Sequence, residues 1–579
     1  MSRKLVYSLL ASLVLVALVL GGCGTPTPTV APTVEVTEEP AAPVETEEPE
    51  EPEAPAETEE PEAPVETEEP EAPSAAGPLW TPELKQAFAA AIDREVLVDR
   101  VFEGRNTPAY HMVPEGYPYA TEPFLDKYGT RDLDMAIELL TDLGYTADAP
   151  FAFDLWYPPE HYGTTTADVM QVMKEQLEET GLMQVTLRSQ NWAEYVNSFV
   201  EGEAYPVFIL GWFPDFADPD NWLTPFASCL QSPDNGVNYC DERMDDLLQR
   251  AAASSDDEER AALYLELGEY YAEQVPTLPL FWEPEFVTYR DGVEGVTIGA
   301  PFEFNYNVLS FGPDAAPAAG TTDTIIIGTT DEVNSLDAQD AYATHDWEII
   351  KNTGLPLLKY VPGTSELVPA AAVDFPEVSE DGLTYTYTLR DDLVFADGTP
   401  VTAADYERMW QRFELGGQVA GLIRVYVADV TAADERTVVF TLHDSYGFFE
   451  ALSATAPMVA THPDIFPTDE IVAYPDFVDG TGPYRVVSYT PSEQMVLEAN
   501  PAYVGDDAAI IPNVIIRYFA DPTTMSNAVE TGQVDVAWRT LGPVEAIRLQ
   551  DVDGLTVDQV DAPALRYLVF NMNYMVGGE

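Results

Sequence analysis

Positive charge is scarce in this sequence. Its 579 residues include 26 Lys and Arg against 101 Asp and Glu, which gives a formal net charge of −75. Such a polyanion is repelled by nucleic-acid backbones and by anionic lipid headgroups, so neither is expected as a partner. The charge favours solubility but carries no information on the fold.

Long apolar runs are equally scarce. One run, 5–20, follows the basic pair Arg3 and Lys4 and precedes Leu-Gly-Gly-Cys, which ends at Cys23. This pattern predicts a secretory signal. Its end resembles a bacterial lipobox, which implies that Cys23 is lipidated and that the protein is extracytoplasmic, anchored to the membrane in the periplasm or at the cell surface. A single uncleaved membrane helix is the alternative, although the run is short for a span of about 20 residues.

No later run approaches that length, so the sequence does not predict a channel or permease. Cysteine is also rare, and only Cys229 and Cys240 remain once Cys23 is assigned to lipid. In an oxidising compartment, a local disulfide between them is the simplest interpretation. Two sulfurs without a neighbouring histidine make a poor metal site, and we expect neither a metal nor a cofactor.

The signature motifs of common enzymes are missing. The five histidines are scattered without an HExxH pair, and there is no GxSxG, Walker loop or GxGxxG after a strand. Paired carboxylates carry no weight, because they occur throughout so acidic a chain. The sequence therefore favours a binding protein over an enzyme.

Residues 24–77 form a low-complexity segment. It contains near-repeats such as EAPAETEEP, with 17 Glu and no Lys, Arg or aromatic residue. Such a segment cannot bury apolar surface and its charges repel one another, so we expect an extended, disordered tether. A second break, 313–320, is a linker of Pro, Ala and Gly.

From residue 78 onward, helical and strand patterns alternate. A predicted helix begins at Thr81 and Pro82 and continues through LKQAFAAAIDREVLVDRVF. Further helices are predicted at 132–143 and 169–177, and one at Thr402 with a capping box to Asp405. Short strands are predicted at QVTLR, TIIIGT, LTYTYTLR, TVVFTLH, PYRVVSY and NVIIRYF. This alternation predicts α/β layers.

Seven sequence blocks resemble family 5 of the bacterial extracellular solute-binding proteins, which includes the oligopeptide- and dipeptide-binding lipoproteins of ABC importers. The blocks are PELKQAFAAAIDREVLVDRVFEG (82–104), FILGWFPDFADPDNW (208–222), VPTLPLFWEPEFVTYRDGVEGV (275–296), FADGTPVTAADYERMWQRF (395–413), VDGTGPYRVVSYTPSEQMVLEANPAYVG (478–505), AVETGQVDVAW (528–538) and LRYLVFNMN (565–573). Together they extend over nearly all of 78–579.

The order of these blocks is swapped. In the family, the equivalent of 321–579 precedes the equivalent of 78–312, so the chain resembles a circular permutation. Domain termini often lie close together, so this order can fold, and Pro78 and Glu579 would then be neighbours. A gene-model or assembly artefact, or a truncated tandem copy, would also explain the order and would leave the predicted fold unchanged.

The resemblance implies an α/β fold with two hinged lobes, like a type II periplasmic binding protein of the large cluster that carries an extra domain. One lobe would comprise 78–280. The other would comprise 281–312 and 321–579, with 313–320 as the linker. A monomer would enclose a peptide or another small solute between closing lobes and deliver it to an ABC permease and its ATPase subunits.

The candidate ligand-binding residues follow from the same resemblance. By the family pattern, Asp215 pairs with the α-amino group of a peptide, which suits a buried carboxylate in need of a partner. The backbone of Gly211, Trp212 and Phe213 would pair with an extended ligand as an added strand. A second backbone contact would come from Tyr342, Ala343 and Thr344. The alternative is that Asp215 caps a turn, the role we expect for Asp218 and Asp220.

One position departs from the pattern of the peptide-binding members. Ile209 stands where some of them carry an arginine for the ligand's carboxylate, which leaves the peptide class itself open. Aromatic residues near the cleft would suit an oligosaccharide equally well, whereas a nickel complex would need a histidine, which the cleft motif lacks. A sensor or adhesin that uses this fold without a transporter is a further alternative.

Overall fold

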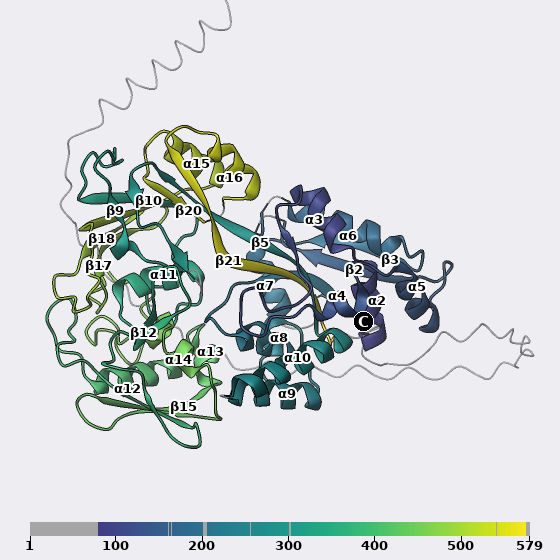
Figure 1. Cartoon of the computed structure of the whole chain (residues 1–579), viewed down its shortest axis with the longest axis horizontal. Helices are drawn as coiled ribbons and strands as arrows, with labels where there is room; N and C mark the ends of the chain where they lie inside the picture. The colour runs from purple at the N-terminus through teal and green to yellow at the C-terminus, as the bar shows by residue number, and fades with distance from the viewer. Residues whose placement is uncertain are drawn as a thin grey trace, which may run out of the picture. The chain divides into compact units, whose positions relative to one another are not determined.

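The computed structural model in Figure 1 describes residues 79–574, with gaps at 160, 164, 201–204, 255, 300–302 and 540. These residues lie in one compact unit, Ala75–Glu579. The signal sequence, the lipidation site Cys23 and the predicted tether 24–77 lie outside the described residues. In the described part of the chain, no helix is both long and apolar enough to cross a membrane.

A mixed sheet of 11 strands forms the centre of this unit. Its order is β17-β18-β19-β10-β20-β5-β21-β4-β2-β3, and β1 (Thr107–Pro108) pairs with β5 off this path. The strands span β17 (Tyr484–Thr490), β18 (Gln494–Ala499), β19 (Asn513–Tyr518), β10 (Thr324–Thr329), β20 (Val536–Trp538), β5 (Thr277–Arg290), β21 (Leu555–Phe570), β4 (Val207–Trp212), β2 (Phe151–Tyr157) and β3 (Met183–Ser189). The predicted strands in this sheet are confirmed.

The long strands β5 and β21 pair antiparallel and connect two lobes (Figure 1). β21 also pairs with β4, in the first lobe (79–281 and 565–572). β5 also pairs with β20, in the second lobe (282–564). This arrangement is the two-lobed α/β fold that the sequence predicts. It positions the middle of β5 and β21 at the crossing between the lobes.

Helices cover the sheet of the first lobe. They are α2 (Pro82–Ala91), α3 (Arg94–Phe102), α4 (Pro123–Tyr128), α5 (Leu133–Asp142), α6 (Thr166–Glu178), α7 (Trp192–Val200), α8 (Thr224–Ala227), α9 (Glu242–Ala253) and α10 (Asp257–Gln274). The single helix predicted from Pro82 to Phe102 is wrong. Asp93 interrupts it, because its side chain accepts a hydrogen bond from the Val96 N–H (2.9 Å) and caps a new helix, α3.

The two ends of the described chain meet in the first lobe. The ring of Trp80 lies 4.9 Å from that of Phe570, and Lys85 Nζ lies 3.9 Å from Met572 Sδ. Pro78 and Glu579 themselves lie outside the described residues, but their described neighbours adjoin as a permuted order requires. The expected assignment of all of 321–579 to the other lobe does not hold for residues 565–570, because they pair with β4 and lie in the core of the first lobe.

The second lobe carries α11 (Thr344–Thr353), α15 (Pro522–Glu530) and α16 (Pro543–Gln550) on its sheet. An additional smaller domain has its own sheet, in the order β13-β14-β16-β15, and its own core. Its elements are β13 (Glu377–Val378), β14 (Thr384–Thr388), β15 (Val427–Ala432), β16 (Thr437–Leu442), α12 (Ala403–Arg412), α13 (Ala420–Arg424) and α14 (Phe449–Leu452). The capping box of α12 between Thr402 and Asp405 is confirmed.

Short strand pairs complete the second lobe: β6 (Val293–Glu294) with β9 (Ser310–Phe311), β7 (Ile298–Gly299) with β8 (Glu303–Phe304), and β11 (Leu358–Tyr360) with β12 (Leu367–Pro369). The linker 313–320 is packed against this lobe, since the Ala318 N–H donates to Asp535 Oδ1 at 2.7 Å. In the first lobe, Cys229 and Cys240 form the expected disulfide, with their Cα atoms 4.2 Å apart.

Candidate ligand-binding site

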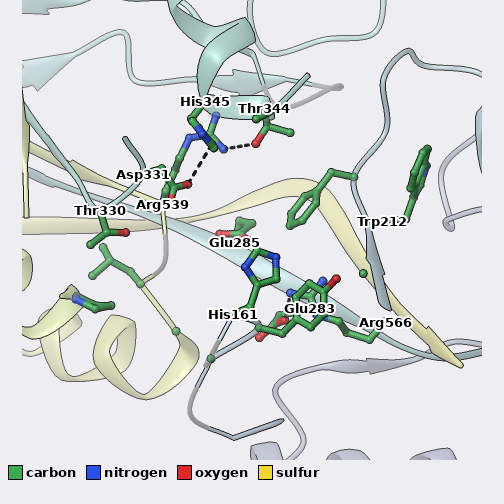
Figure 2. A pocket seen from close by; sticks show the side chains of 18 of the residues that line it. His161, Trp212, Glu283, Glu285, Thr330, Asp331, Thr344, His345, Arg539 and Arg566 are labelled. Atoms are coloured by element: carbon green, nitrogen blue, oxygen red, sulfur yellow. Dashed lines mark hydrogen bonds and ion pairs between the residues drawn. The ribbon is translucent and has the colours of Figure 1, made fainter. Parts of the chain in front are cut away.

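A cavity of about 1360 Å³ lies where the two lobes face each other. The first lobe lines it with His161, Tyr162, Trp192 and the segment 211–215, and β5 and β21 add Glu283, Glu285 and Arg566 (Figure 2). The second lobe lines it with 303–305, the start of α11 and residues that flank α15 and α16. All seven predicted ligand-binding residues line this one cavity: Gly211, Trp212, Phe213, Asp215, Tyr342, Ala343 and Thr344.

Asp215 follows β4 and is held in place by neutral hydrogen-bond donors. Asn221 fixes the turn, because its Oδ1 accepts from the Asp215 N–H (2.8 Å) while its Nδ2 donates to Asp215 Oδ2 (3.0 Å). The Tyr342 hydroxyl, from the second lobe, donates to the same Oδ2 at 3.2 Å. Burial raises the pKa of Asp215 to about 6, although these hydrogen bonds and the charge of Lys351 oppose the shift. Asp215 forms no ion pair with any described residue.

The other two carboxylates of this loop are engaged inside the protein. Asp218 caps the short 3-10 helix Pro219–Trp222 and forms a salt bridge with Arg260 (2.9 Å). Asp220 accepts hydrogen bonds from Thr224 (2.6 Å) and Tyr426 (3.3 Å). Asp218 and Asp220 therefore shape the loop, as expected, and the cap of the 3-10 helix is Asp218, while the carboxylate of Asp215 accepts a hydrogen bond from Asn221 of the same loop.

The edge of β4 is partly occupied. Its neighbour β2 pairs only with Val207 and Phe208. Beyond them, the Tyr195 hydroxyl donates to the Ile209 carbonyl (2.9 Å) and the Gly211 N–H donates to the Tyr162 hydroxyl. A Cβ at Gly211 would lie 2.7 Å from Arg566 Nη1 and 2.8 Å from Tyr162 Cε1. Glycine at this position thus makes room for protein side chains, and the Gly211 N–H that was predicted to pair with a ligand is bonded to Tyr162 instead.

The second lobe presents charges that are already paired. Arg539 binds Glu348 (2.8 Å) and the Thr344 hydroxyl (2.9 Å), and the Trp538 indole N–H donates to Glu348 at 2.9 Å. Lys351 forms a salt bridge with Glu303 beside them. Arg539 has a left-handed backbone (φ 74°), a strained conformation for a residue with a side chain. These contacts fix the start of α11, where Tyr342, Ala343 and Thr344 lie.

Several cavity residues were not predicted. Arg566 of β21 pairs with Glu283 of β5 (2.6 Å), while the side chain of Glu285 forms no hydrogen bond or ion pair with a described residue. Burial, followed by repulsion from Glu283, raises the pKa of Glu285 to about 7. Glu283 and Glu285 stand in the EPE triplet of the block 275–296, and Arg566 stands in the block 565–573, but both patterns also fit an ordinary strand.

Two histidines also line the cavity, although the predicted cleft motif contains none. The ring of His161 stacks on Trp192 at 3.5 Å, and His345 lies 3.8 Å from Asp331. Burial, then the charges of Arg566 and His345, lowers the pKa of His161 to about 3, so this ring is neutral at physiological pH. Within the described ranges, no group of three or more His, Cys, Asp or Glu is arranged to hold a metal ion.

A family model described as "Bacterial extracellular solute-binding proteins, family 5 Middle" matches residues 63–234 and 366–577. The chain belongs to this family. The two matched segments extend over more than half of the chain, and their division is consistent with the swapped order of the blocks. In this family 5 protein, the seven residues that were predicted to bind a ligand lie around one cavity.

Curated relatives match it over part of their length. The Dipeptide-binding protein of Escherichia coli (strain K12) is 27% identical over 229 residues, which cover 38% of this chain and 41% of the relative. The Probable di/tripeptide-binding protein 5 of Pseudomonas aeruginosa (strain UCBPP-PA14) is 30% identical over 39% of this chain and 42% of the relative. The chain thus spans about two fifths of these relatives.

A solved structure, that of a periplasmic oligopeptide-binding protein from Borrelia burgdorferi, is 22% identical to this chain, with a TM-score of 0.35. The matched region covers 40% of this chain and 50% of the solved chain.

Proposed function

We propose that this family 5 protein is the extracytoplasmic, lipid-anchored binding protein of an ABC importer, that it is not an enzyme, and that it captures oligopeptides between its two lobes. Its partners would be a membrane permease and the ATPase subunits. The observation that carries the proposal is Asp215, a buried carboxylate that lies at the wall of a large cavity and has no cationic partner among the described residues.

A peptide supplies what Asp215 lacks. A buried charge is costly unless it is paired, and the α-ammonium group of a peptide would pair with this carboxylate. Asn221 and Tyr342 hold the carboxylate in place, because both donate hydrogen bonds to it. The cavity, at about 1360 Å³, exceeds the roughly 300–1,000 Å³ of ordinary small-molecule sites, which leaves room for a chain of several residues.

The aromatic lining alone would also suit an oligosaccharide. Tyr162, Trp192, Trp212 and Trp347 face the same cavity and could stack on sugar rings. A neutral sugar, however, would enclose Asp215 without a counter-charge, which burial disfavours. The charge of the site therefore favours the peptide.

The two strands between the lobes provide the hinge in this proposal. The hydrogen bond from Tyr342 to Asp215 connects the two lobes. A ligand that binds Asp215 would therefore change the strength of a contact between the lobes. Closure would then be populated in proportion to the ligand's preference for the closed state. The permuted order would leave this hinge intact, since Trp80 and Phe570 adjoin in the first lobe.

Native mass spectrometry of the protein purified from residue 24 onward tests the proposal, with released small molecules identified in the same experiment. We expect a compact monomer that carries a series of short peptides. A compact monomer that carries a sugar would move the ligand to another class. A broad, highly charged and empty species would show that the swapped order does not fold.

A further inference from the structure

We propose that Glu285 forms a second cation-binding subsite in this cavity, so that the preferred peptide carries a basic side chain in addition to its α-ammonium group. This inference rests on the proposed function and specifies its substrate class. It comes from the charges around the cavity and from the position of Glu285 on β5.

The lysine and arginine side chains that line the cavity are already neutralised. Arg566 pairs with Glu283 (2.6 Å), Arg539 with Glu348 (2.8 Å), Lys351 with Glu303, and Arg105 with Glu103 (2.8 Å). Among the described lining residues, these are all the permanently charged cations. None of these four cations is therefore free to neutralise a further carboxylate of the cavity, whereas a cationic group of a ligand can do so.

Glu285 is such a carboxylate. It follows Glu283 by two residues on β5, so both side chains lie on the same face of the strand and line the cavity. Opposite it, the pairing of β5 with β21 is interrupted between Val560 and Ala564, at the crossing between the lobes. Figure 2 shows Glu285 between Arg539 and His161, near the middle of the site.

The groups around Glu285 do not satisfy it. Arg566 and Arg539 attract it from a distance, but each is bound to another glutamate, while Glu283 and Asp331 repel it. His161 is neutral and provides no charge. The pKa of about 7 reflects this deficit, since a carboxylate with a bound cation would ionise more readily.

Asp215 and Glu285 lie on separate elements, the loop after β4 and the strand β5. A single ammonium group would satisfy one of them. A ligand that satisfies both is a chain with two cationic groups, and a peptide with a lysine or arginine side chain has this chemistry.

Isothermal titration calorimetry with matched tripeptides tests the inference. In the test peptides lysine occupies position one, two or three between alanines; in the control peptides norleucine, which has a neutral side chain of similar length, replaces it. We expect the wild-type protein to bind at least one lysine peptide about tenfold or more tightly than its norleucine partner. In Glu285→Gln this ratio should fall to about one, while norleucine peptides bind as they do to the wild type.

The control variant is Glu258→Gln, which removes one negative charge from the exposed face of α10 and should keep the full lysine preference. Glu285→Gln should fold, because it removes an unpaired charge, and its melting temperature without ligand should equal or exceed that of the wild type. Binding of both peptide sets without any preference would overturn the subsite alone. Absence of binding by every peptide would overturn the proposed function as well.

Discussion

The two lobes contribute to the cavity in opposite ways. The second lobe presents charges that neutralise one another, since Arg539 and Lys351 bind Glu348 and Glu303. The first lobe presents aromatic rings and two carboxylates, Asp215 and Asp234, and the hydrogen-bond partners of the buried Asp215 are the neutral Asn221 and Tyr342. The ion pairs of the second lobe therefore contrast with Asp215 in the first lobe, and Glu285, on the strand β5 that joins the lobes, resembles Asp215.

This difference separates the residues that hold the protein together from those that await a ligand. A paired buried charge is strongly destabilising when it loses its partner, whereas an unpaired one destabilises the ligand-free fold and gains from binding. Substitutions in the second lobe should thus change the free energy of unfolding, and substitutions at Asp215 should change affinity.

The largest effect is expected from Glu348→Gln. It leaves the buried guanidinium of Arg539 without its counter-charge and weakens the hydrogen bond from Trp538. We expect the free energy of unfolding to fall by about 3–5 kcal/mol, measured by urea denaturation. The exposed Glu366→Gln serves as the control and should change nothing; a Glu348 variant as stable as this control would contradict the distinction between the walls.

Asp215→Asn should act on binding. We expect peptides with a free amino group to lose about 2–4 kcal/mol of binding free energy, measured by calorimetry, because the buried counter-charge is gone. Amino-acetylated peptides should bind the variant and the wild type alike, and the free energy of unfolding should not decrease. Equal losses for free and acetylated peptides would remove the basis for assigning the amino group to Asp215.

Loss of the disulfide should have a smaller effect, confined to stability. Replacement of both Cys229 and Cys240 by serine should lower the free energy of unfolding by about 2–3 kcal/mol, because the unfolded chain is no longer constrained. The ratio of affinities for free and acetylated peptides should stay the same, which calorimetry on the folded variant can establish. A changed ratio would show that this loop also positions Asp215.

The smallest effect is a dependence on pH with opposite signs for affinity and stability. Because the pKa of Asp215 is about 6 without ligand, affinity for amino-terminal peptides should fall about tenfold from pH 7 to pH 5 as the carboxylate is protonated. For folding, a raised carboxylate pKa contributes stability that is present below about pH 4 and is lost as pH rises through 6.

As the pH falls from 7 to 5, Asp215 should therefore raise the melting temperature of the ligand-free protein, while the affinity for amino-terminal peptides falls. Titrations at both pH values with peptides that carry only neutral side chains, repeated with Asp215→Asn, separate this group from Glu285, since the variant should lose the dependence of affinity on pH for these peptides. A wild-type affinity that is equal at pH 7 and pH 5 would contradict the assignment.

Elements set by local signals could be predicted from the sequence. The β-branched runs at β10, β16 and β19 and the capping box at Thr402 depend on neighbouring residues, and all are confirmed. The break at Asp93 was missed although its signal is local, because the apolar pattern continues on both sides of it and outweighs one capping side chain.

The site could be predicted where one contiguous segment carries it. Residues 211–215 and 342–344 were placed by resemblance to the family, and they meet in the cavity. Glu285, Arg566 and His161 could not be found in this way, because their surroundings arise only when β5 and β21 cross between the lobes. The EPE triplet in β5 has the same alternation as a strand that faces solvent.

The pairing of β21 with β4 and β5 also bears on how the protein folds. Thr277 lies opposite Val569, and Val207 lies opposite Phe570, so most of the described chain separates strands that share hydrogen bonds. Such a high contact order slows folding, because long loops close before the contacts that stabilise them form. Until β21 arrives, both of its neighbours expose unpaired edges that can pair with other chains. Refolding yield should therefore depend steeply on protein concentration, and the strand that completes the binding site is also the one that ends this vulnerable period.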